Sequence, residues 1–496
     1  MRPKIAPAAW LIAAVTLAVH VATSGRYGWF RDELYFIACG HHLAWGYVDQ
    51  PPLIAVIARA FAAAHNLYLF RLPAALAHAG LVVLVAVAAR RMGGGAFAQA
   101  LAALATAIAP VLLLFGHVQT MNAYEPLAWL GAALVVLAVA DGADARWWIL
   151  GGAIIGVGLL DKHSVALFAF ALVVGVAVTP ARRALASRWF AAALALATLI
   201  VLPHLAWQIG HGWPMLELLR HGQEYKNEPV SPAQFFVGQL ILLHPLTAPV
   251  WLLGLVRLVR VRRLRPLGIA ALVVAALVIA LHGKIYYLAP LYPLLFAAGG
   301  VAIEALIARA WLRVAVFALL AAGGAATAPL ALPILSVPSL LRYQAALHFE
   351  PPHTERLRYR PLAQIFADEH GWPELEAAVA RVYRSLPPDE QRQASVYARN
   401  YGEAGAIDFF GERDGLPPAR SGHNSYYTWG PPPGDIVIAV GGAREDYLRH
   451  FRTVDEAARL PPNPWVMPYE DELPIYVARG LKVPRAEAWA AARHYE

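Results

Sequence analysis

The sequence is poor in cysteine and in charge. Cys39 is the only cysteine among the 496 residues, which excludes an intrachain disulfide, so the fold has to hold without that covalent support. Hydrophobic residues make up 59% of the chain and charged residues 15%. A soluble domain has about 45 to 50% apolar and about 25% charged residues, so we predict a protein with many membrane-spanning helices instead.

The sequence also lacks an internal repeat of the transporter kind, low-complexity segments and a clear signal-peptide cleavage site. The first apolar stretch, Pro7 to Ala22, is therefore interpreted as a retained helix. The net charge is +8, but cytoplasmic loops of membrane proteins collect Lys and Arg, so this charge does not indicate nucleic acid as a partner.

Eleven apolar segments are candidates for membrane-spanning helices, since a span needs roughly 20 apolar residues. The stretch 147–179 is interrupted by Asp161, Lys162 and His163, and it is either one tilted helix or a hairpin of two short ones. The hairpin brings the arginine clusters at 90–91, 182–188 and 257–265 to the same side, as the positive-inside rule requires, and we predict it. The segments centre on 7–23, 72–89, 97–115, 123–140, 147–160, 164–179, 190–208, 233–256, 267–281, 287–307 and 314–333.

Eleven spans place the N-terminus in the cytoplasm and the C-terminal tail outside. From about Arg342 the composition becomes charged and punctuated by proline, so we predict a membrane domain over 1–340 and a soluble α/β domain over 341–496. Within the membrane domain, 24–71 is the first outer loop, with juxtamembrane helices. In the soluble domain we expect helices at 373–386 and 443–451, and strands at 393–401, 435–442 and 473–480.

The first outer loop concentrates carboxylates next to an expected membrane surface. Asp32 and Glu33 stand side by side, and apolar and aromatic residues recur near helical spacing from Leu34 to Trp45, which predicts an amphipathic helix in the interface. Pro51 and Pro52 can begin a second, short helix. A solvated loop end with aromatic anchors is the plain alternative.

Four features in order along the chain carry a family resemblance. They are RDELYF after the first span, DQPPL later in the same loop, Asn122 with Glu125 at the start of the fourth span, and HGKIYYLAPLYP before the tenth. Together they resemble the polyprenyl-phosphate-sugar glycosyltransferases, which include the protein O-mannosyltransferase family (glycosyltransferase family 39) and the lipid A aminoarabinose transferases. The resemblance covers roughly residues 1 to 335.

The resemblance implies a membrane-embedded fold of the GT-C class in a bacterial inner membrane, with a periplasmic active site and C-terminal domain. It implies transfer of a sugar from a polyprenyl phosphate, such as undecaprenyl phosphate, to a lipid, glycan or protein acceptor. Asp32 matches the family's catalytic base. In the aminoarabinose branch a lysine before the Pro-Pro pair contacts the lipid phosphate, but this chain has Gln50 there, which leaves that contact and the branch open.

This reaction requires one general base for the acceptor hydroxyl and positively charged groups around the leaving phosphate. An acceptor hydroxyl has to lose its proton, whereas the phosphate leaves as an anion and needs cations and hydrogen-bond donors. Adjacent helical residues point about 100° apart, so Asp32 and Glu33 cannot both address one atom. We assign Asp32 as the base and Glu33 to orienting a neighbour or pairing with Arg31 or Lys284; a charge favoured by the helix dipole is the alternative for Glu33.

Lys284 is the leading candidate for contacting the phosphate, although a lysine snorkelling at a helix end has the same signature. Glu125 is either a functional intramembrane carboxylate or a carboxylate hydrogen-bonded between helices. The triplet 161–163 is either part of the site or a hairpin turn whose charges neutralise each other. The expected substrate-binding residues are Lys284, Tyr286, Tyr287, His282, Gln50, Asp49, Asn122, Glu125 and Lys162.

The sequence leaves a metal ion open and requires no cofactor. Five histidines lie near outer helix ends without a compact ligand spacing such as HExxH, so a divalent metal is only weakly signalled. These are His41, His42, His117, His244 and His282. The stretch 424–435 is rich in side chains that stack on sugars, and it either contacts the acceptor or forms a proline-rich loop between strands.

A transporter or flippase for polyprenyl-linked lipids or solutes is the rival function. Such a protein also has many spans and intramembrane charges, but it needs neither a soluble outer domain nor an acidic pair in the first outer loop.

Overall fold

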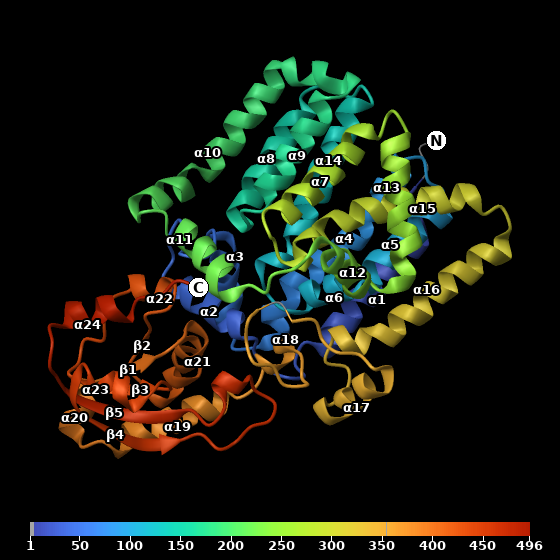
Figure 1. Ribbon diagram of the computed structural model, residues 1–496. Helices are drawn as coiled ribbons and strands as arrows, with labels where there is room; N and C mark the ends of the chain where they lie inside the picture. Colours follow the sequence, from blue (N-terminus) through green and yellow to red (C-terminus); the bar gives the residue numbers. More distant parts are fainter. Residues whose placement is uncertain (1–3, 354) are drawn as a thin grey trace. The chain divides into compact units, whose positions relative to one another are not determined.

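A computed structural model describes residues 4–353 and 355–496 (Figure 1). By its internal contacts the chain divides into two compact units. Unit 1 consists of Met1–Arg26, Asn66–Trp207 and Pro229–Ser336, and unit 2 of Tyr27–His65, Gln208–Glu228 and Val337–Glu496. The division by composition at residue 340 thus lies close to the last of these borders, but the contacts group the first outer loop with the C-terminal region.

Unit 1 is built from apolar helices. Within the described residues, five helices are long and apolar enough to cross a membrane alone, and up to eight spans result if three helix pairs, bent by 65°, 115° and 99°, each count as one. A helix lies in each of the eleven predicted segments, and the segments 97–115 and 233–256 each contain two, which gives thirteen helices. They are α1 (Pro7–Thr23), α4 (Leu67–Arg91), α5 (Ala96–Ile108), α6 (Pro110–His117), α7 (Glu125–Ala140), α8 (Trp147–Asp161), α9 (Val165–Ala177), α10 (Arg188–Gly210), α12 (Pro232–Leu243), α13 (Ala248–Arg260), α14 (Arg265–Ala280), α15 (Tyr292–Leu306) and α16 (Ala310–Ala331).

The predicted hairpin is confirmed as two helices. α8 ends at Asp161, and α9 begins at Val165. At the break, Nζ of Lys162 bonds to Oε2 of Glu125, and neither oxygen of Asp161 has a hydrogen-bond partner within the described residues. The chain is therefore a multi-pass membrane protein with short as well as long spans.

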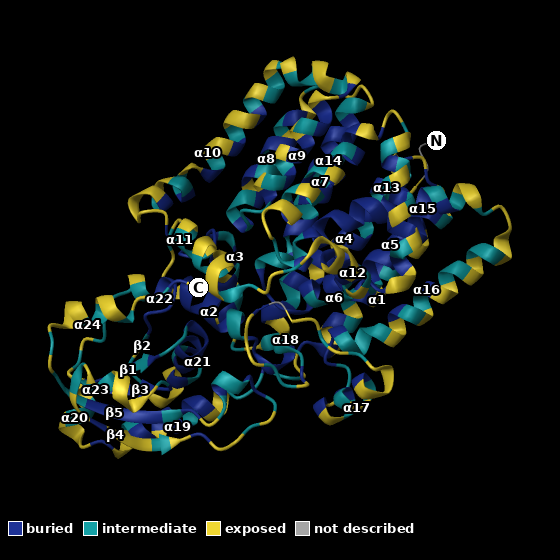
Figure 2. Cartoon of the chain, viewed as in Figure 1, coloured by how far each residue is buried: buried dark blue, intermediate teal, exposed yellow. Residues whose placement is uncertain are grey.

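Helix α15 lies at the centre of unit 1 and is almost entirely buried, whereas α10 and α16 are largely exposed (Figure 2). Helix α15 packs closely against α13 at two glycines. Gly254 of α13 faces α15, and Gly299 of α15 faces α13. A Cβ on Gly254 would lie 2.0 Å from the carbonyl oxygen of Leu295, and one on Gly299 would lie 1.8 Å from that of Val250. These small residues let the two backbones approach closely. Such close packing matters in lipid, because helices there are held together by van der Waals contacts and not by the exclusion of water.

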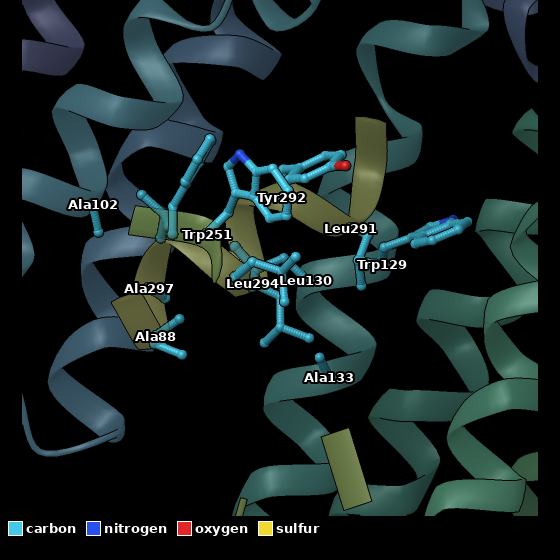
Figure 3. Packing of buried hydrophobic residues seen from close by; sticks show 14 of the residues in the cluster. Ala88, Ala102, Trp129, Leu130, Ala133, Trp251, Leu291, Tyr292, Leu294 and Ala297 are labelled. Carbon is cyan, nitrogen blue, oxygen red and sulfur yellow. The ribbon is translucent and has the colours of Figure 1, made fainter. Parts of the chain in front are cut away.

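Aromatic side chains fill the space between the helices of unit 1. Trp251 and Tyr292 meet edge to face with ring centroids 5.7 Å apart, beside Leu294 (Figure 3). Trp129 on α7 stacks on Phe168 of α9 at 4.4 Å. Ring pairs of this kind contribute about 0.5 to 1.5 kcal/mol beyond the area they bury.

Unit 2 contains a five-stranded sheet with helices. The strand order is β2-β1-β3-β5-β4; β1 pairs in parallel with β2 and β3, and β5 pairs antiparallel with β3 and β4 (Figure 1). The strands are β1 (Ala394–Ala398), β2 (Ala419–Arg420), β3 (Ile436–Val440), β4 (Phe451–Arg459) and β5 (Pro474–Leu481). The helices are α2 (Arg31–His41), α3 (Leu53–Ala62), α11 (Pro214–His221), α17 (Val337–Leu347), α18 (Gln364–Ala367), α19 (Trp372–Ser385), α20 (Pro388–Gln393), α21 (Tyr401–Gly411), α22 (Ser425–Thr428), α23 (Arg444–Leu448) and α24 (Arg485–Ala492). The predicted fold class, a polytopic helical membrane protein with a small C-terminal α/β domain, is confirmed.

Candidate active site

Helix α2 begins at the acidic pair of the first outer loop. The backbone N–H of Phe30, the residue before the helix, donates to Oε2 of Glu33 at 2.9 Å, and the Glu33 side chain is fully buried. This capping interaction satisfies a backbone donor at the positive end of the helix dipole. Glu33 thus caps its own helix, and Arg31, one of its two expected partners, pairs with Asp32 and Asp368.

Asp32 is held on one side and accessible on the other. The hydroxyl of Tyr401 donates to Oδ1 at 2.9 Å, and Nε of Arg31 lies 3.5 Å from the same oxygen. The second oxygen, Oδ2, accepts no hydrogen bond within the described residues, and 30% of the side chain is exposed. One oxygen of a fixed carboxylate therefore remains able to accept a proton.

Arg31 organises the surroundings of this carboxylate. Its NH1 donates to the hydroxyl of Tyr469 at 2.6 Å and lies 3.6 Å from Oδ2 of Asp368, while the guanidinium stands 5.3 Å above the ring of Tyr401. Burial alone would lower the pKa of Arg31, but Asp368, the two tyrosines and Asp32 together raise it. Arg31 is a permanent positive charge beside Asp32.

Asp49, an expected substrate-binding residue, lies next to the same aromatic groups. Its Oδ1 accepts from the hydroxyl of Tyr35 at 2.7 Å, and the ring of Tyr35 stacks on that of Tyr401 at 4.5 Å. Burial raises the pKa of Asp49 to about 6, and the charge of Asp32 adds to this effect. Unit 2 therefore brings Asp32 and Asp49 to one pair of stacked tyrosines.

Two other predicted positions have contacts within this unit. Gln50 is fully buried; its Nε2 lies 3.6 Å from Sγ of Cys39, and its Oε1 has no hydrogen-bond partner. Ser425, from the sugar-stacking stretch 424–435, donates its backbone N–H to the Tyr35 hydroxyl at 3.2 Å and accepts from Val48 N–H. Part of that stretch thus lies beside Asp49.

A second cluster belongs to unit 1 and contains five of the predicted residues. Nζ of Lys162 donates to Oδ1 of Asn122 at 2.6 Å and to Oε2 of Glu125 at 2.8 Å. The same ammonium group lies 5.9 Å from the ring centre of Tyr286 and 5.3 Å from that of Tyr287. An ammonium group has three N–H donors, so one remains for a further acceptor.

His282 and Lys284 lie just before the two tyrosines of this cluster in the sequence. Lys284 directly precedes a short 3₁₀ turn, Ile285–Leu291, and is half-buried, whereas His282 is exposed with a φ of 53°. The contact of Lys162 with the two tyrosines was not predicted, because 124 or more sequence positions separate the two segments.

One group of side chains in the described residues has the composition of a metal site. His423, His494 and Glu496 offer ligand atoms that all lie within 4.8 Å of one another. Zinc ligands lie about 2 Å from the ion, hence no more than about 4 Å apart, so this group would have to contract around a metal. Nδ1 of His423 already accepts from the backbone N–H of Tyr401 at 3.4 Å. Sequence spacing could not reveal the group, because 71 positions separate His423 from His494.

Comparisons with known proteins support the resemblance. A protein family described as dolichyl-phosphate-mannose-protein mannosyltransferase matches residues 49–207. No curated protein sequence matches the chain. Among solved structures, ArnT from Cupriavidus metallidurans bound to undecaprenyl phosphate superposes with a TM-score of 0.60 at 18% identity, over 94% of this chain and 97% of that one. The apo state of ArnT gives 0.59 at 17% identity over the same shares.

The two structural matches extend over almost the whole chain and show a shared fold. The inferred resemblance to the GT-C glycosyltransferases is confirmed in fold and in the matched family segment.

Proposed function

We propose that the protein is a glycosyltransferase that moves a sugar from a polyprenyl phosphate to a hydroxyl group of an envelope acceptor, with inversion at the anomeric carbon. The acceptor oxygen forms a bond to that carbon, and the bond from the carbon to the phosphate oxygen breaks. The hydroxyl proton passes to Asp32, and the lipid phosphate leaves with the electron pair of the broken bond. The undecaprenyl phosphate bound to ArnT and the matched mannosyltransferase family support a donor of this chemistry.

The state of the Asp32 carboxylate is the observation that carries this proposal. Tyr401 and Arg31 hold Oδ1, while Oδ2 is without a hydrogen bond among the described residues and the side chain is part-exposed. A general base needs such a fixed carboxylate with one free oxygen, and general base help contributes about a hundredfold to ten-thousandfold in rate.

The donor phosphate requires cations and hydrogen-bond donors. We assign this role to Lys162, whose third N–H is unused, together with Lys284. Glu125 and Asn122 then act as positioning residues, because they fix the ammonium group of Lys162. Cations aimed at a leaving phosphate stabilise the charge that develops on it.

The direct test is transfer of radiolabelled sugar from polyprenyl-phosphate-sugar donors to an envelope extract. Wild type, Asp32→Asn and the control Asp389→Asn are compared; Asp389 is exposed and pairs with Arg392. We expect Asp32→Asn to lose at least about a hundredfold in transfer while still binding donor, and the control to match wild type.

Other results of this experiment would favour a different base or a flippase. Equal transfer by Asp32→Asn and wild type would refute Asp32 as the base. Movement of labelled lipid across a vesicle membrane without any transfer would support the flippase instead. The orientation we propose, with the N-terminus in the cytoplasm and unit 2 in the periplasm, is checked by cysteine labelling from either side of the membrane.

A further inference from the structure

A cavity of about 590 Å³ lies in unit 2, along the part of α2 that follows Asp32. Its walls come from 37–42 on α2, 59–65 at the end of α3 and 405–418 on and after α21. Ligand pockets measure about 300 to 1,000 Å³, so the cavity has the size of a binding site.

The side chains of two cationic or protonatable residues in this cavity form no ion pair within the described residues. Arg59 is exposed to the cavity and makes neither a hydrogen bond nor an ion pair within the described residues. His41, exposed at the same wall, likewise makes no hydrogen bond there. An arginine fork offers two parallel N–H groups, the geometry that matches a carboxylate or a phosphate.

The two acidic residues that line the cavity are already engaged. Asp408 accepts from the hydroxyl of Tyr426 and from the backbone N–H of Ala419, both at 2.7 Å. Glu412 lies 3.9 Å from Nε2 of His65. Neither carboxylate forms an ion pair with Arg59 within the described residues.

Positive charge accumulates around the imidazoles. Burial lowers the pKa of His41, and Arg59 and His65 lower it further against the opposing effect of Glu412. Burial also lowers the pKa of His42, with Arg420 and His41 adding to the effect. A bound anion would oppose this positive field and favour protonated His41.

The remaining walls are apolar. They consist of Ile37, Phe409, Leu416, Pro417 and Pro418 beside several alanines. The cavity thus offers a cationic wall for a charged group and an apolar wall for the hydrocarbon next to it.

We propose that this cavity binds the phosphate group of an anionic amphiphile, with the Arg59 guanidinium donating two hydrogen bonds to phosphate oxygens and protonated His41 donating a third. The phosphate belongs either to a membrane lipid headgroup or to a free phosphate ester. The site is additional to Asp32 and does not depend on the transfer reaction.

The test is native mass spectrometry of the full chain in detergent, titrated with phosphatidylglycerol, with phosphatidylcholine and with free glycerophosphoglycerol. We expect phosphatidylglycerol to bind wild type, and Arg59→Gln to bind it about tenfold more weakly, as for the loss of a charged hydrogen-bond partner. Arg413→Gln is the matched control, because Arg413 is exposed, lies near the cavity in the sequence and does not line it. Arg59→Lys keeps the charge without the fork and should bind with intermediate affinity.

Lipid binding measured at two pH values tests the role of His41. A phosphodiester keeps one negative charge, so tighter binding at about pH 5.5 than at about pH 7.5 reports histidine protonation, and His41→Gln should remove most of the difference. Equal binding by wild type and Arg59→Gln, or phosphatidylcholine bound as tightly as phosphatidylglycerol, would overturn the proposal. Free glycerophosphoglycerol binding as tightly as the lipid would assign the site to soluble phosphate esters.

Asp32→Asn should bind phosphatidylglycerol like wild type. A failure of the transfer reaction and a failure of this site are thereby distinguishable. Thermal unfolding of each variant in the same detergent verifies that it is folded.

Discussion

Asp32 uses its two carboxylate oxygens differently, and this asymmetry depends on one hydroxyl. The Tyr401 hydroxyl fixes Oδ1, while the Tyr401 ring stacks on Tyr35. The hydroxyl and the ring of Tyr401 therefore have separable roles.

Replacing Tyr401 by Phe tests the hydroxyl alone. The ring stacking is kept and the hydrogen bond to Asp32 is lost, so we expect kcat to fall by about tenfold or more with little change in KM. Steady-state kinetics of transfer measure this split. Tyr383→Phe is the control, because its hydroxyl bonds at 3.4 Å to the carbonyl of Gln391. A rise in KM at constant kcat would instead assign Tyr401 to substrate binding.

At the residue scale the sequence points to candidate groups of the proposed site but not to their partners. Asp32 and Asp49 stand out because charged residues are rare in this chain and both lie in the first outer loop. Tyr401 could not be predicted as a partner of Asp32, since 369 positions separate them and many tyrosines have the same local surroundings. The contact comes from packing that local patterns do not encode.

At the scale of elements, α2 and α21 pack closely through Gly405. A Cβ at this position would lie 2.9 Å from the carbonyl carbon of Leu34 and 3.1 Å from the backbone nitrogen of Tyr35. Backbone atoms cannot move aside as a flexible side chain can, so the two helices depend on the missing side chain at this point.

Gly405→Ala should therefore force α21 away from α2. We expect a loss of about 1 to 3 kcal/mol in stability, as for overpacked cores, together with reduced transfer, because α2 carries Asp32 and α21 carries Tyr401. Thermal unfolding in detergent measures the first effect. Gly222→Ala serves as the control, since its Cβ would meet only Asn227 at 3.8 Å. An unchanged unfolding midpoint for Gly405→Ala would show that the contact is not tight in solution.

The elements that the sequence predicts are those with regular apolar patterns. The helix at 373–386 and the buried strand at 435–442 correspond to α19 and β3. The strand β4 is not predicted, because it is exposed along most of its length and only Val454 is buried. Its sequence therefore lacks the alternation of apolar and polar residues that is typical of a strand. The helix α21 is also missed, since its buried residues include glycines and Glu403.

At the scale of the whole molecule, unit 2 buries several carboxyl groups. Nδ2 of Asn400 donates to Oε1 of Glu403 at 2.9 Å and to Oε1 of Glu470 at 2.8 Å. Burial raises the pKa of Glu403 to about 7, and burial together with Glu403 raises that of Glu470. The folded chain consequently binds protons that an unfolded chain releases at neutral pH.

The sign of the pH dependence follows from these raised pKa values. Between the ordinary glutamate pKa of 4.5 and about 7, the folded state binds more protons, so stability falls as the pH rises through this range. We expect the pair Glu403 and Glu470 to contribute to this fall together, and Glu470→Gln to reduce the fall between about pH 5 and about pH 8. Unfolding in detergent across this range measures it. Glu456→Gln, an exposed residue paired with Arg459, should retain the full pH dependence, and an unchanged pH dependence in Glu470→Gln would contradict the interpretation.

The discontinuity of unit 2 affects the synthesis of the protein. Arg31 and Asp32 leave the ribosome long before Tyr401, and at about 5 to 20 residues per second the 369 intervening positions take roughly 20 to 75 s to translate. During this time nearly all membrane helices emerge while the acidic loop still lacks its partners. The surroundings of Asp32 are thus assembled last, so a chain whose translation stops early would be inserted in the membrane without the contacts that we propose for the catalytic base.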